Sequence, residues 1–403
     1  MSQPITVLFL ATEYKGAAVV RECKAQGCHV ILITEEEREH EPWPREAIHD
    51  FFMMPDLSDT QAVMNGVSYL ARDRAIDVII ALDDYDVEMA ATLREHLRLS
   101  GMGSTLVRYF RDKLAMRGQA AAGGVRVPGF TGIFNYDKLR EFMANTPPPW
   151  VLKPRAEAGA VGIRKLNEPE ELWRALDELG DLRSYHLLED FVPGDIYHVD
   201  SITYGGEVKF AIVHKYGRPP LSVSHDGGVF STRTLPRDGD EAKELLAINA
   251  NLLKALQMKD GVTHAEFIRG HADGQLYFLE IGARVGGANI AETVEFASGI
   301  NLWQEWARVE LARARNEDYN PPADKGGYAG IIICLAKQKR ADLSGYQDPE
   351  VVWRLEKDYH AGLIIASQDP TRIENLLNDY TDRFGQDFLA VGPKETKIRT
   401  FSN

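Results

Sequence analysis

The chain has 403 residues and a formal net charge of −14 at pH 7, with 26% charged and 44% hydrophobic residues. This length exceeds one ordinary hydrophobic core and predicts two or three domains of a globular protein. The acidic balance argues against a nucleic-acid or anionic-membrane partner, because such partners are bound through clusters of lysine and arginine.

The cysteines and the N-terminus bear on the cellular compartment. Cys23, Cys28 and Cys334 form no CxxC pair, and their odd number argues against a disulfide framework. No apolar run approaches the roughly 20 residues of a membrane span. Residues 1–4 lead into an apolar segment without the basic region of a signal peptide. We therefore expect a cytoplasmic protein with no membrane partner.

The first hundred residues alternate between strand and helix patterns. These patterns occupy segments 5–11, 16–26, 28–34, 48–54, 59–72, 77–82 and 86–99. The alternation predicts a parallel sheet covered by helices, so residues 1–103 form a Rossmann-like domain. The residues after the first strand contain no GxGxxG, and a dinucleotide is not expected there.

A helix pattern follows this domain. Ser104 is a suitable N-cap, and the pattern continues to Gly123, where glycine ends it. This prediction places Lys113 in the middle of one long helix. Taken alone, a lysine on a helix is more often a solvated charge than a ligand.

A second lysine lies on the apolar strand pattern of residues 150–154. Lys153 directly precedes loop 155–162, which contains Gly159 and Gly162. A lysine at an exposed strand end and the amides of such a loop can hold one phosphate chain. The loop lacks the GK[ST] ending of a P-loop, and an ordinary flexible hairpin is the alternative interpretation.

The next segments carry weaker signals. Asp195, His198 and Asp200 lie on one strand pattern, but zinc is not favoured, because no cysteine and no second well-spaced histidine accompanies them. Residues 217–235 are turn-rich, as in a loop that closes over a substrate or an idle surface loop. Helices are expected at 241–256, 301–315 and 372–380, and strands at 328–335 and 362–367.

The runs 262–268 and 276–287 flank Asp273-Gly274 and predict a β-hairpin. With the turn centred on Asp273, Ile268 faces Phe278 and Glu266 faces Glu280. Facing carboxylates lie about 5 Å apart and repel unless a cation or a proton lies between them, and hard oxygen ligands suit magnesium. Arg284 adds donors that suit a phosphoryl oxygen. On the hairpin alone, an acidic hairpin with a solvated carboxylate is equally compatible.

Together and in this order, these segments resemble the ATP-grasp superfamily of carboxylate-amine ligases, with the pattern of the L-amino acid ligase and biotin carboxylase-like branch. The resemblance implies a combined α/β and α+β architecture. The Rossmann-like domain precedes two α+β subdomains, residues 104–190 and 191–320, that grip ATP, and an α+β lobe follows at 321–403.

The resemblance also implies ATP and Mg²⁺ as cofactors and a set of site residues. Lys153 and Arg284 are the implied catalytic residues. The family often has Asn two residues after its second metal-binding Glu, where this chain has Gly282. The implied contacts are Lys113, Lys153, Gly159 and Gly162 with the phosphates, Glu189, Asp190, Phe191 and Val192 with adenine, Asp195 or His198 with the ribose, Glu266 and Glu280 with Mg²⁺, and Arg284, Gly286 and Gly287 with the substrate.

The implied reaction joins an amino acid or small carboxylate to an amine through an acyl phosphate, with release of ADP and phosphate. Small molecules are the implied partners, and a homodimer is left open. Two alternatives remain: an ATP-grasp enzyme with another acceptor, such as a bicarbonate-using carboxylase or a purine-pathway ligase, and a nucleotide-binding module without catalysis. The intact set of charged residues argues against the second.

Overall fold

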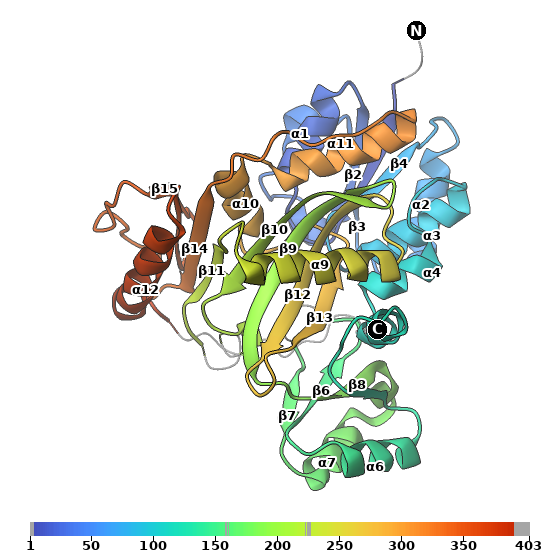
Figure 1. Ribbon diagram of the computed structural model, residues 1–403. Coiled ribbons are helices and arrows are strands. Elements are labelled where there is room, and N and C mark those ends of the chain that lie inside the picture. Colours follow the sequence, from blue (N-terminus) through green and yellow to red (C-terminus); the bar gives the residue numbers. More distant parts are fainter. Residues whose placement is uncertain (1–3, 158, 160, 222, 224–226, 391–403) are drawn as a thin grey trace.

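The structure is a computed structural model that describes residues 4–157, 159, 161–221, 223 and 227–390. Three sheets organise these residues: a four-stranded parallel sheet, an eight-stranded antiparallel sheet and a four-stranded antiparallel sheet. The eight-stranded sheet lies between the other two (Figure 1). We call the three parts the N-terminal lobe, the large sheet and the small lobe.

The N-terminal lobe has the predicted β-α-β alternation. Its parallel sheet has the order β3-β2-β1-β4, and all six residues of β1 are buried, as expected for a strand covered by helices on both faces. The elements are β1 Thr6–Ala11, α1 Ala17–Ala25, β2 His29–Glu35, β3 Asp50–Met54, α2 Thr60–Leu70, β4 Val78–Ala81 and α3 Val87–Leu97, with 3-10 turns at Glu36–Arg38 and Arg45–Ala47.

The single helix predicted from Ser104 to Gly123 is wrong. The chain instead forms α4 Ser104–Val107, a 3-10 turn Arg108–Phe110 and then α5 Lys113–Ala122. Asp112 has an extended backbone, and its side chain accepts hydrogen bonds from the amides of Leu114 and Ala115. This N-cap starts a new helix, so Lys113 is the first residue of α5 rather than a mid-helix residue.

The small lobe is a sheet of order β5-β8-β6-β7 with α6 and α7 packed on it (Figure 1). Its core contains the fully buried Trp150 and the apolar sides of both helices. The elements are β5 Phe130–Gly132, α6 Tyr136–Asn145, β6 Trp150–Pro154, β7 Arg164–Leu166, α7 Pro169–Leu179, a 3-10 segment Gly180–Tyr185 and β8 His186–Asp190.

The large sheet has the order β13-β12-β9-β10-β11-β14-β16-β15, so the last strands of the chain continue the sheet that contains the predicted hairpin. Its strands are β9 Gly194–Tyr204, β10 Glu207–Tyr216, β11 Phe230–Thr234, β12 Gly261–Gly270, β13 Leu276–Gly282, β14 Tyr328–Leu335, β15 Val351–Arg354 and β16 His360–Ser367. The helices are α9 Asp240–Ala255, α10 Ile290–Ser298, α11 Leu302–Arg315 and α12 Pro370–Asp387.

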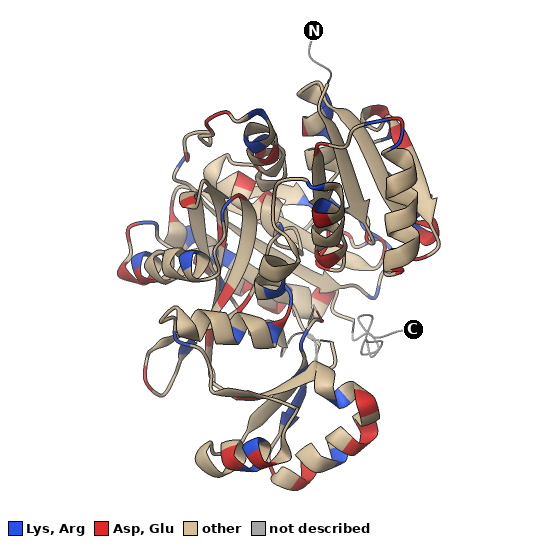
Figure 2. Ribbon diagram, turned by 90° about the vertical axis from the view of Figure 1, so that its right-hand side faces the viewer, with Lys and Arg blue, Asp and Glu red and all other residues tan. Residues whose placement is uncertain are grey.

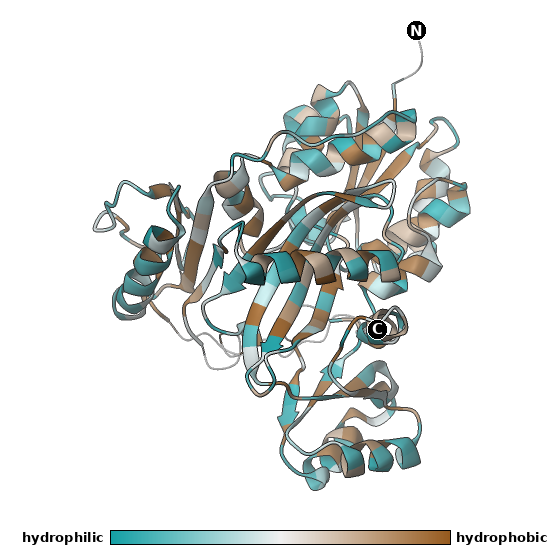
Figure 3. Cartoon of the chain, in the orientation of Figure 1, coloured by the Kyte–Doolittle hydropathy of each residue, from teal (hydrophilic) through white to brown (hydrophobic). Residues whose placement is uncertain are grey.

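Strand alternation gives the middle of the large sheet two different faces. One face packs Tyr197, Val199 and Phe267 in one core cluster with Leu245 and Leu252 of α9. In Figure 3 hydrophobic residues are concentrated in the strands inside the molecule, whereas the outer sides of the helices are mostly hydrophilic. The opposite face at mid-sheet is polar, and it carries the candidate site.

The distribution of charged residues and the state of the cysteines can be compared with what the composition indicated. Acidic and basic residues are intermixed over the helices in Figure 2. Cys23, Cys28 and Cys334 are buried and unpaired. Among the described helices, none combines the length and apolar composition needed to cross a membrane.

The stability of the hairpin can be tested at Phe278, which is fully buried and lies 6.0 Å from Phe267 between ring centroids. We expect Phe278→Ala to lower the free energy of unfolding by about 3–5 kcal/mol, because it leaves a cavity beneath β12 and β13. Denaturant unfolding measures this. The control is Phe296→Ala at a 41% exposed ring, where a change under about 0.5 kcal/mol is expected. Equal losses in the two variants would contradict the packing argument.

Candidate active site

The β12–β13 hairpin brings Glu266 and Glu280 directly opposite each other, as predicted, but by a different route. Next to the turn, Phe278 pairs with Phe267 and Tyr277 with Ile268, so the predicted pairing of Ile268 with Phe278 is wrong. The register shifts by one residue between these pairs and the Glu266–Glu280 pair. A β-bulge therefore re-aims Glu280 to the face of Glu266, since an unbroken ladder would have placed the two side chains on opposite faces.

These carboxylates belong to a polar row that crosses five strands. Residues in direct register lie on one face of a sheet. The row runs from Glu280 on β13 through Glu266, His198 and His214 to Thr234 on β11. The adjacent row contains Gly282, His264 and Asp200. Strand pairing thus gathers polar residues that are widely separated in sequence.

Cationic and hydroxyl groups surround the two carboxylates. Lys113 Nζ lies 3.2 Å from Glu280 Oε2 and donates to the carbonyl oxygen of Glu157 at 2.5 Å. The Tyr216 hydroxyl donates to Glu266 Oε1 at 2.7 Å. Burial raises the pKa of Glu266, but the neighbouring His264 and the Tyr216 hydrogen bond outweigh burial and hold this pKa below its usual value. Glu266 is therefore ionised at neutral pH.

Arg284 is held by a residue of the N-terminal lobe. Its Nε and Nη2 both lie 2.6 Å from Asp84 Oδ2, and its Nη1 donates to the carbonyl oxygen of Val285 at 2.9 Å. Gly282 leaves room for this carboxylate, because a Cβ at that position would lie 3.0 Å from Asp84 Oδ1. Burial raises the pKa of Asp84, yet Arg284 and Arg111 hold it below its usual value, so the pair is charged.

Lys153 is buried in the small lobe, and the expectation of an exposed strand end is wrong. Its ammonium forms an ion pair with Glu189 on the neighbouring strand β8, and Arg117 Nε lies 2.6 Å from the other oxygen of Glu189. Burial lowers the pKa of Lys153 to about 8, and Arg117 lowers it while Glu189 raises it. The lysine therefore loses charge readily as the pH rises.

The structure places the remaining adenine and ribose candidates as follows. The backbone amides of Asp190 and Phe191 donate to the carbonyl oxygens of Gly129 and Pro149. Val192 is partly buried and packs against the cluster of Ile196, Tyr216 and Ile268. Asp195 is half-exposed and forms a 2.7 Å ion pair with Lys215. His198 is fully buried, with both ring nitrogens engaged by Asp200 and Thr232. Of the two ribose candidates, Asp195 is the accessible one.

The glycine candidates lie in two places. Gly159 and Gly162 both have positive φ, 68° and 72°, whereas residues 158 and 160 of the same loop lie outside the described residues. A Cβ at Gly286 would lie 2.9 Å from His264 Nδ1 and 3.1 Å from Asp200 Oδ1. The turn after Arg284 therefore packs closely on the polar rows of the sheet. Gly287 has no neighbour near the position of a Cβ.

Several residues of the site were missed from the sequence. Asp84, Arg117 and Tyr216 contact predicted residues from another lobe, helix or strand, whereas His264 contacts Glu266 from the same strand. The one local signal was the spacing of His264 and Glu266, which places both on one face of a strand. The others depend on long-range pairing that sequence spacing does not encode.

The donor set at the hairpin fits a magnesium ion. Two carboxylates face each other, and Lys113 and Tyr216 each occupy only one oxygen of one carboxylate. The remaining oxygens are hard donors, and the mutual repulsion of the two groups favours a cation between them.

Comparisons with known proteins identify two domains in this chain. Residues 20–101 match the ATP-grasp N-terminal domain, and residues 146–292 match the ATP-grasp domain. The L-arginine-specific L-amino acid ligase of Bacillus subtilis is 24% identical over 287 residues, which cover 70% of this chain and 68% of the relative.

Solved structures share the fold over nearly the whole chain. An L-amino acid ligase from Bacillus licheniformis has a TM-score of 0.73 at 17% identity and covers 98% of this chain and 100% of its own. The biotin carboxylase domain of the Hydrogenobacter thermophilus 2-oxoglutarate carboxylase, a dimer in complex with MgADP, ADP and bicarbonate, has a TM-score of 0.69 at 17% identity and covers 97% of this chain and 92% of its own.

The fold and the two domain matches, which together span more than half of the chain, define an ATP-grasp protein. The chain belongs to the ATP-grasp superfamily of carboxylate-amine ligases, as the sequence predicted, and is an ATP-dependent ligase of the class that forms carbon–nitrogen bonds.

The contact between lobes at Arg284 is testable. We expect Asp84→Asn to lower kcat/KM by about 10- to 100-fold, because a hydrogen bond to a charged group contributes roughly 1.5–3 kcal/mol and the arginine loses its fixed orientation. Steady-state kinetics of ATP-dependent phosphate release measures this. The control is Asp50→Asn, which removes another Asp–Arg pair of the same lobe, with Arg74, far along the sheet at β3. An unchanged kcat/KM in Asp84→Asn would rule out the positioning role.

Proposed function

We propose that this protein is an ADP-forming ligase that joins an amino acid or another small carboxylate to an amine through an acyl phosphate. The observation that carries the proposal is the convergence of Glu266, Glu280 and Lys113, with Arg284 just after the end of β13. We include in the proposal the division into domains 1–103, 104–190, 191–320 and 321–403.

In this proposal the charged residues divide the work on ATP. Lys113 and Lys153 hold the phosphates from the side of the small lobe, with loop 155–162 closing over them. Glu266 and Glu280 hold Mg²⁺, which when bound supplies positive charge to the phosphate oxygens. Arg284, oriented by Asp84, faces the phosphoryl group that moves. The segment from Glu189 to Val192 meets adenine, and Asp195 lies near the ribose.

The chemistry proceeds in two displacements. A carboxylate oxygen of the first substrate attacks the γ-phosphorus, the bond to the β–γ bridging oxygen breaks, and ADP leaves. The amine nitrogen of the second substrate then attacks the acyl carbon, and the carbon–oxygen bond to phosphate breaks. Phosphate leaves with the electron pair of that bond and takes up the proton that the nitrogen loses. Exclusion of water protects the acyl phosphate between the two steps.

The substrate class follows from the turn after Arg284 and from the relatives. Gly286 and Gly287 allow backbone amides to approach a carboxylate. The relative from Bacillus subtilis is named for L-arginine, and an amino acid is accordingly the first substrate to test. A bicarbonate-using or purine-type acceptor is the second candidate, which the biotin carboxylase neighbour in complex with bicarbonate favours. That neighbour is a dimer, and a homodimer stays a prediction for this chain.

A product assay tests the proposal. Amino acids supplied singly and in pairs with ATP and Mg²⁺ should release ADP and phosphate with at least one pair. Glu280→Gln should lower this rate by about 100-fold or more, because the facing carboxylates lose half of their charge for the metal. The control is Glu207→Gln, whose exposed carboxylate pairs with Lys209 on the same strand. Release of AMP and pyrophosphate, or equal rates in both variants, would refute the proposal.

The pKa of Lys153 predicts how nucleotide affinity depends on pH. In the free protein this pKa is lowered to about 8 by burial, whereas bound phosphate favours the charged ammonium and raises the pKa. Affinity is therefore constant below about pH 8 and falls above it by up to roughly tenfold per pH unit. Titration of MgATP by calorimetry between about pH 7 and pH 9.5 measures this fall.

Lys153→Arg is the matched variant for this titration. Its guanidinium stays charged over the whole range, so the affinity should lose most of its dependence on pH. A fall of the same steepness in both proteins would show that another group titrates.

A further inference from the structure

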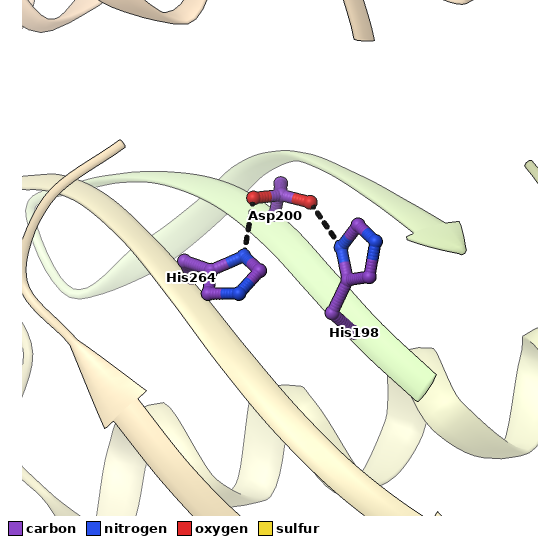
Figure 4. Close-up of side chains that lie close together, drawn as sticks. All are labelled: His198, Asp200 and His264. Carbon is purple, nitrogen blue, oxygen red and sulfur yellow. Dashed lines mark hydrogen bonds and ion pairs between the residues drawn. The ribbon is translucent and has the colours of Figure 1, made fainter. Parts of the chain in front are cut away.

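Two groups of buried charges lie near the candidate site, and they differ in how their charges balance. In the first, the two oxygens of Asp200 lie 2.7 Å from His198 Nδ1 and 2.9 Å from His264 Nδ1, so both oxygens have partners (Figure 4). The second group, which we call the small-lobe charge cluster, consists of Lys153, Glu189 and Arg117. Its three side chains are at most 6% exposed. Two cations and one anion give this cluster an excess of buried positive charge.

The strand register places Lys153 and Glu189 beside each other. In the antiparallel pair of β6 and β8, Lys153 faces Leu187 and Val151 faces Glu189. The two charged residues are therefore diagonal neighbours on one face of the sheet. The Lys153 ammonium contacts one carboxylate oxygen of Glu189. The other oxygen is paired by a residue from outside this sheet.

Helix α5 supplies that residue. Arg117 lies one turn after Lys113, so both side chains project from one face of α5. Arg117 Nε lies 2.6 Å from Glu189 Oε1, and the guanidinium carbon lies 5.4 Å from the centre of the Phe278 ring on β13. The fully buried arginine therefore contacts the small lobe and the large sheet at the same time.

The hydrogen bonding of Arg117 does not account for its burial. Within the described residues, neither Nη1 nor Nη2 has a hydrogen-bond partner, although both atoms are buried. An arginine in a buried ion pair ordinarily uses its planar fork for two parallel hydrogen bonds. A buried ion pair is also weak evidence for a stabilising role, because apolar side chains of similar volume often serve the fold as well. The feature of Arg117 that matters is therefore its charge beside Glu189.

Phosphate binding changes the surroundings of Lys153. In the proposed function Lys153 holds the phosphates of ATP, and the present inference rests on that role. To approach a phosphate oxygen, the ammonium has to weaken its contact with Glu189. Loss of one partner from a buried ion pair is strongly unfavourable, because the other charge is left uncompensated. Arg117 removes this obstacle, since its guanidinium cannot be deprotonated and stays beside Glu189.

We propose that Arg117 is a positioning residue for nucleotide binding, which keeps Glu189 paired and so leaves the Lys153 ammonium available to phosphate. Arg117 acts through Glu189 and does not touch the nucleotide. The charges around the cluster support this role. Burial lowers the pKa of Lys153, Glu189 raises it, and Arg117 and Lys113 lower it. Burial raises the pKa of Glu189, but Arg117 and Lys153 hold it below its usual value, so the carboxylate stays ionised.

Binding of MgATP to Arg117→Met tests the inference. This variant keeps a long apolar side chain but removes the charge, so Lys153 becomes the only charged partner of Glu189. We expect the affinity for MgATP, measured by calorimetry near pH 7, to fall about 10- to 100-fold, as for the loss of a contact to a charged group. Arg117→Lys restores a positive charge and should recover most of the affinity. Arg117→Gln replaces Arg117→Met if that variant does not fold, and the same loss is expected of it.

The pH dependence of the affinity separates this role from a loss of packing. Removal of Arg117 removes a charge that lowers the pKa of Lys153, so the fall in affinity that begins at about pH 8 should move to higher pH. Glu189→Gln removes the charge that raises this pKa, and the fall should move to lower pH. A variant that is only less well packed would keep the pH dependence of the unchanged protein.

Two further variants complete the test. Arg140→Met removes an exposed arginine of the same lobe, paired with Asp137, and should keep both the affinity and its pH dependence. Circular dichroism checks that each variant is folded. If Lys153→Ala binds MgATP as tightly as the unchanged protein, the proposed role of Lys153 fails and the inference fails with it. If Lys153→Ala binds more weakly but Arg117→Met does not, the inference alone is overturned. Equal losses in Arg117→Met and Arg117→Lys without a shift in pH dependence would overturn it as well.

Discussion

The face-to-face placement of Glu266 and Glu280 is the constraint on which the rest of the site depends. Two charges about 5 Å apart, as expected for facing carboxylates, repel by roughly 3 kcal/mol at an effective dielectric constant of about 20. The β-bulge in β13 places the two carboxylates opposite each other. Lys113, Tyr216 and the charged His264 stabilise their negative charge. This repulsion destabilises the folded protein but favours the binding of a cation. Unfavourable charge pairs of this kind are concentrated at functional sites.

Three parts of the chain meet at this point, and each contributes a contact that the others lack. The large sheet supplies the carboxylates, α5 begins at Lys113 between the sheet and the small lobe, and the N-terminal lobe supplies Asp84 to Arg284. Tyr85 of the N-terminal lobe also donates to Glu157 Oε2 at 3.3 Å, beside the carbonyl oxygen that Lys113 contacts. Lys113 and Glu157 therefore form contacts with both the large sheet and the N-terminal lobe.

The sequence predicted the elements better than their contacts. Hydrophobic periodicity identified the parallel sheet, α9, α11, β14 and β16, because each depends on local spacing, but it missed the short strand β15. Periodicity missed the break at Asp112, where a capping side chain starts a new helix. The predicted hairpin placed Phe278 one residue out of register, because a β-bulge leaves no clear signal in the local sequence. Lys153 was expected at the surface, but its burial follows from Glu189 and Arg117, which arrive from another strand and another helix. Asp84 and His214 could not be found at all from spacing, since each reaches its partner from a distant segment.

Strand β12 positions both Glu266 of the carboxylate pair and the charged His264 beside it. The two-residue repeat of β12 places His264 and Glu266 on one face and packs Ala265 and Phe267 against α9 on the other. The two polar positions have different roles: Glu266 faces Glu280, whereas His264 forms ion pairs with Asp200 and Glu266. The neighbouring His264 lowers the pKa of Glu266, so the carboxylate stays ionised although it is buried. Rigid packing of the opposite face then fixes the distance between the two positions, so the geometry of Glu266 depends on what holds His264.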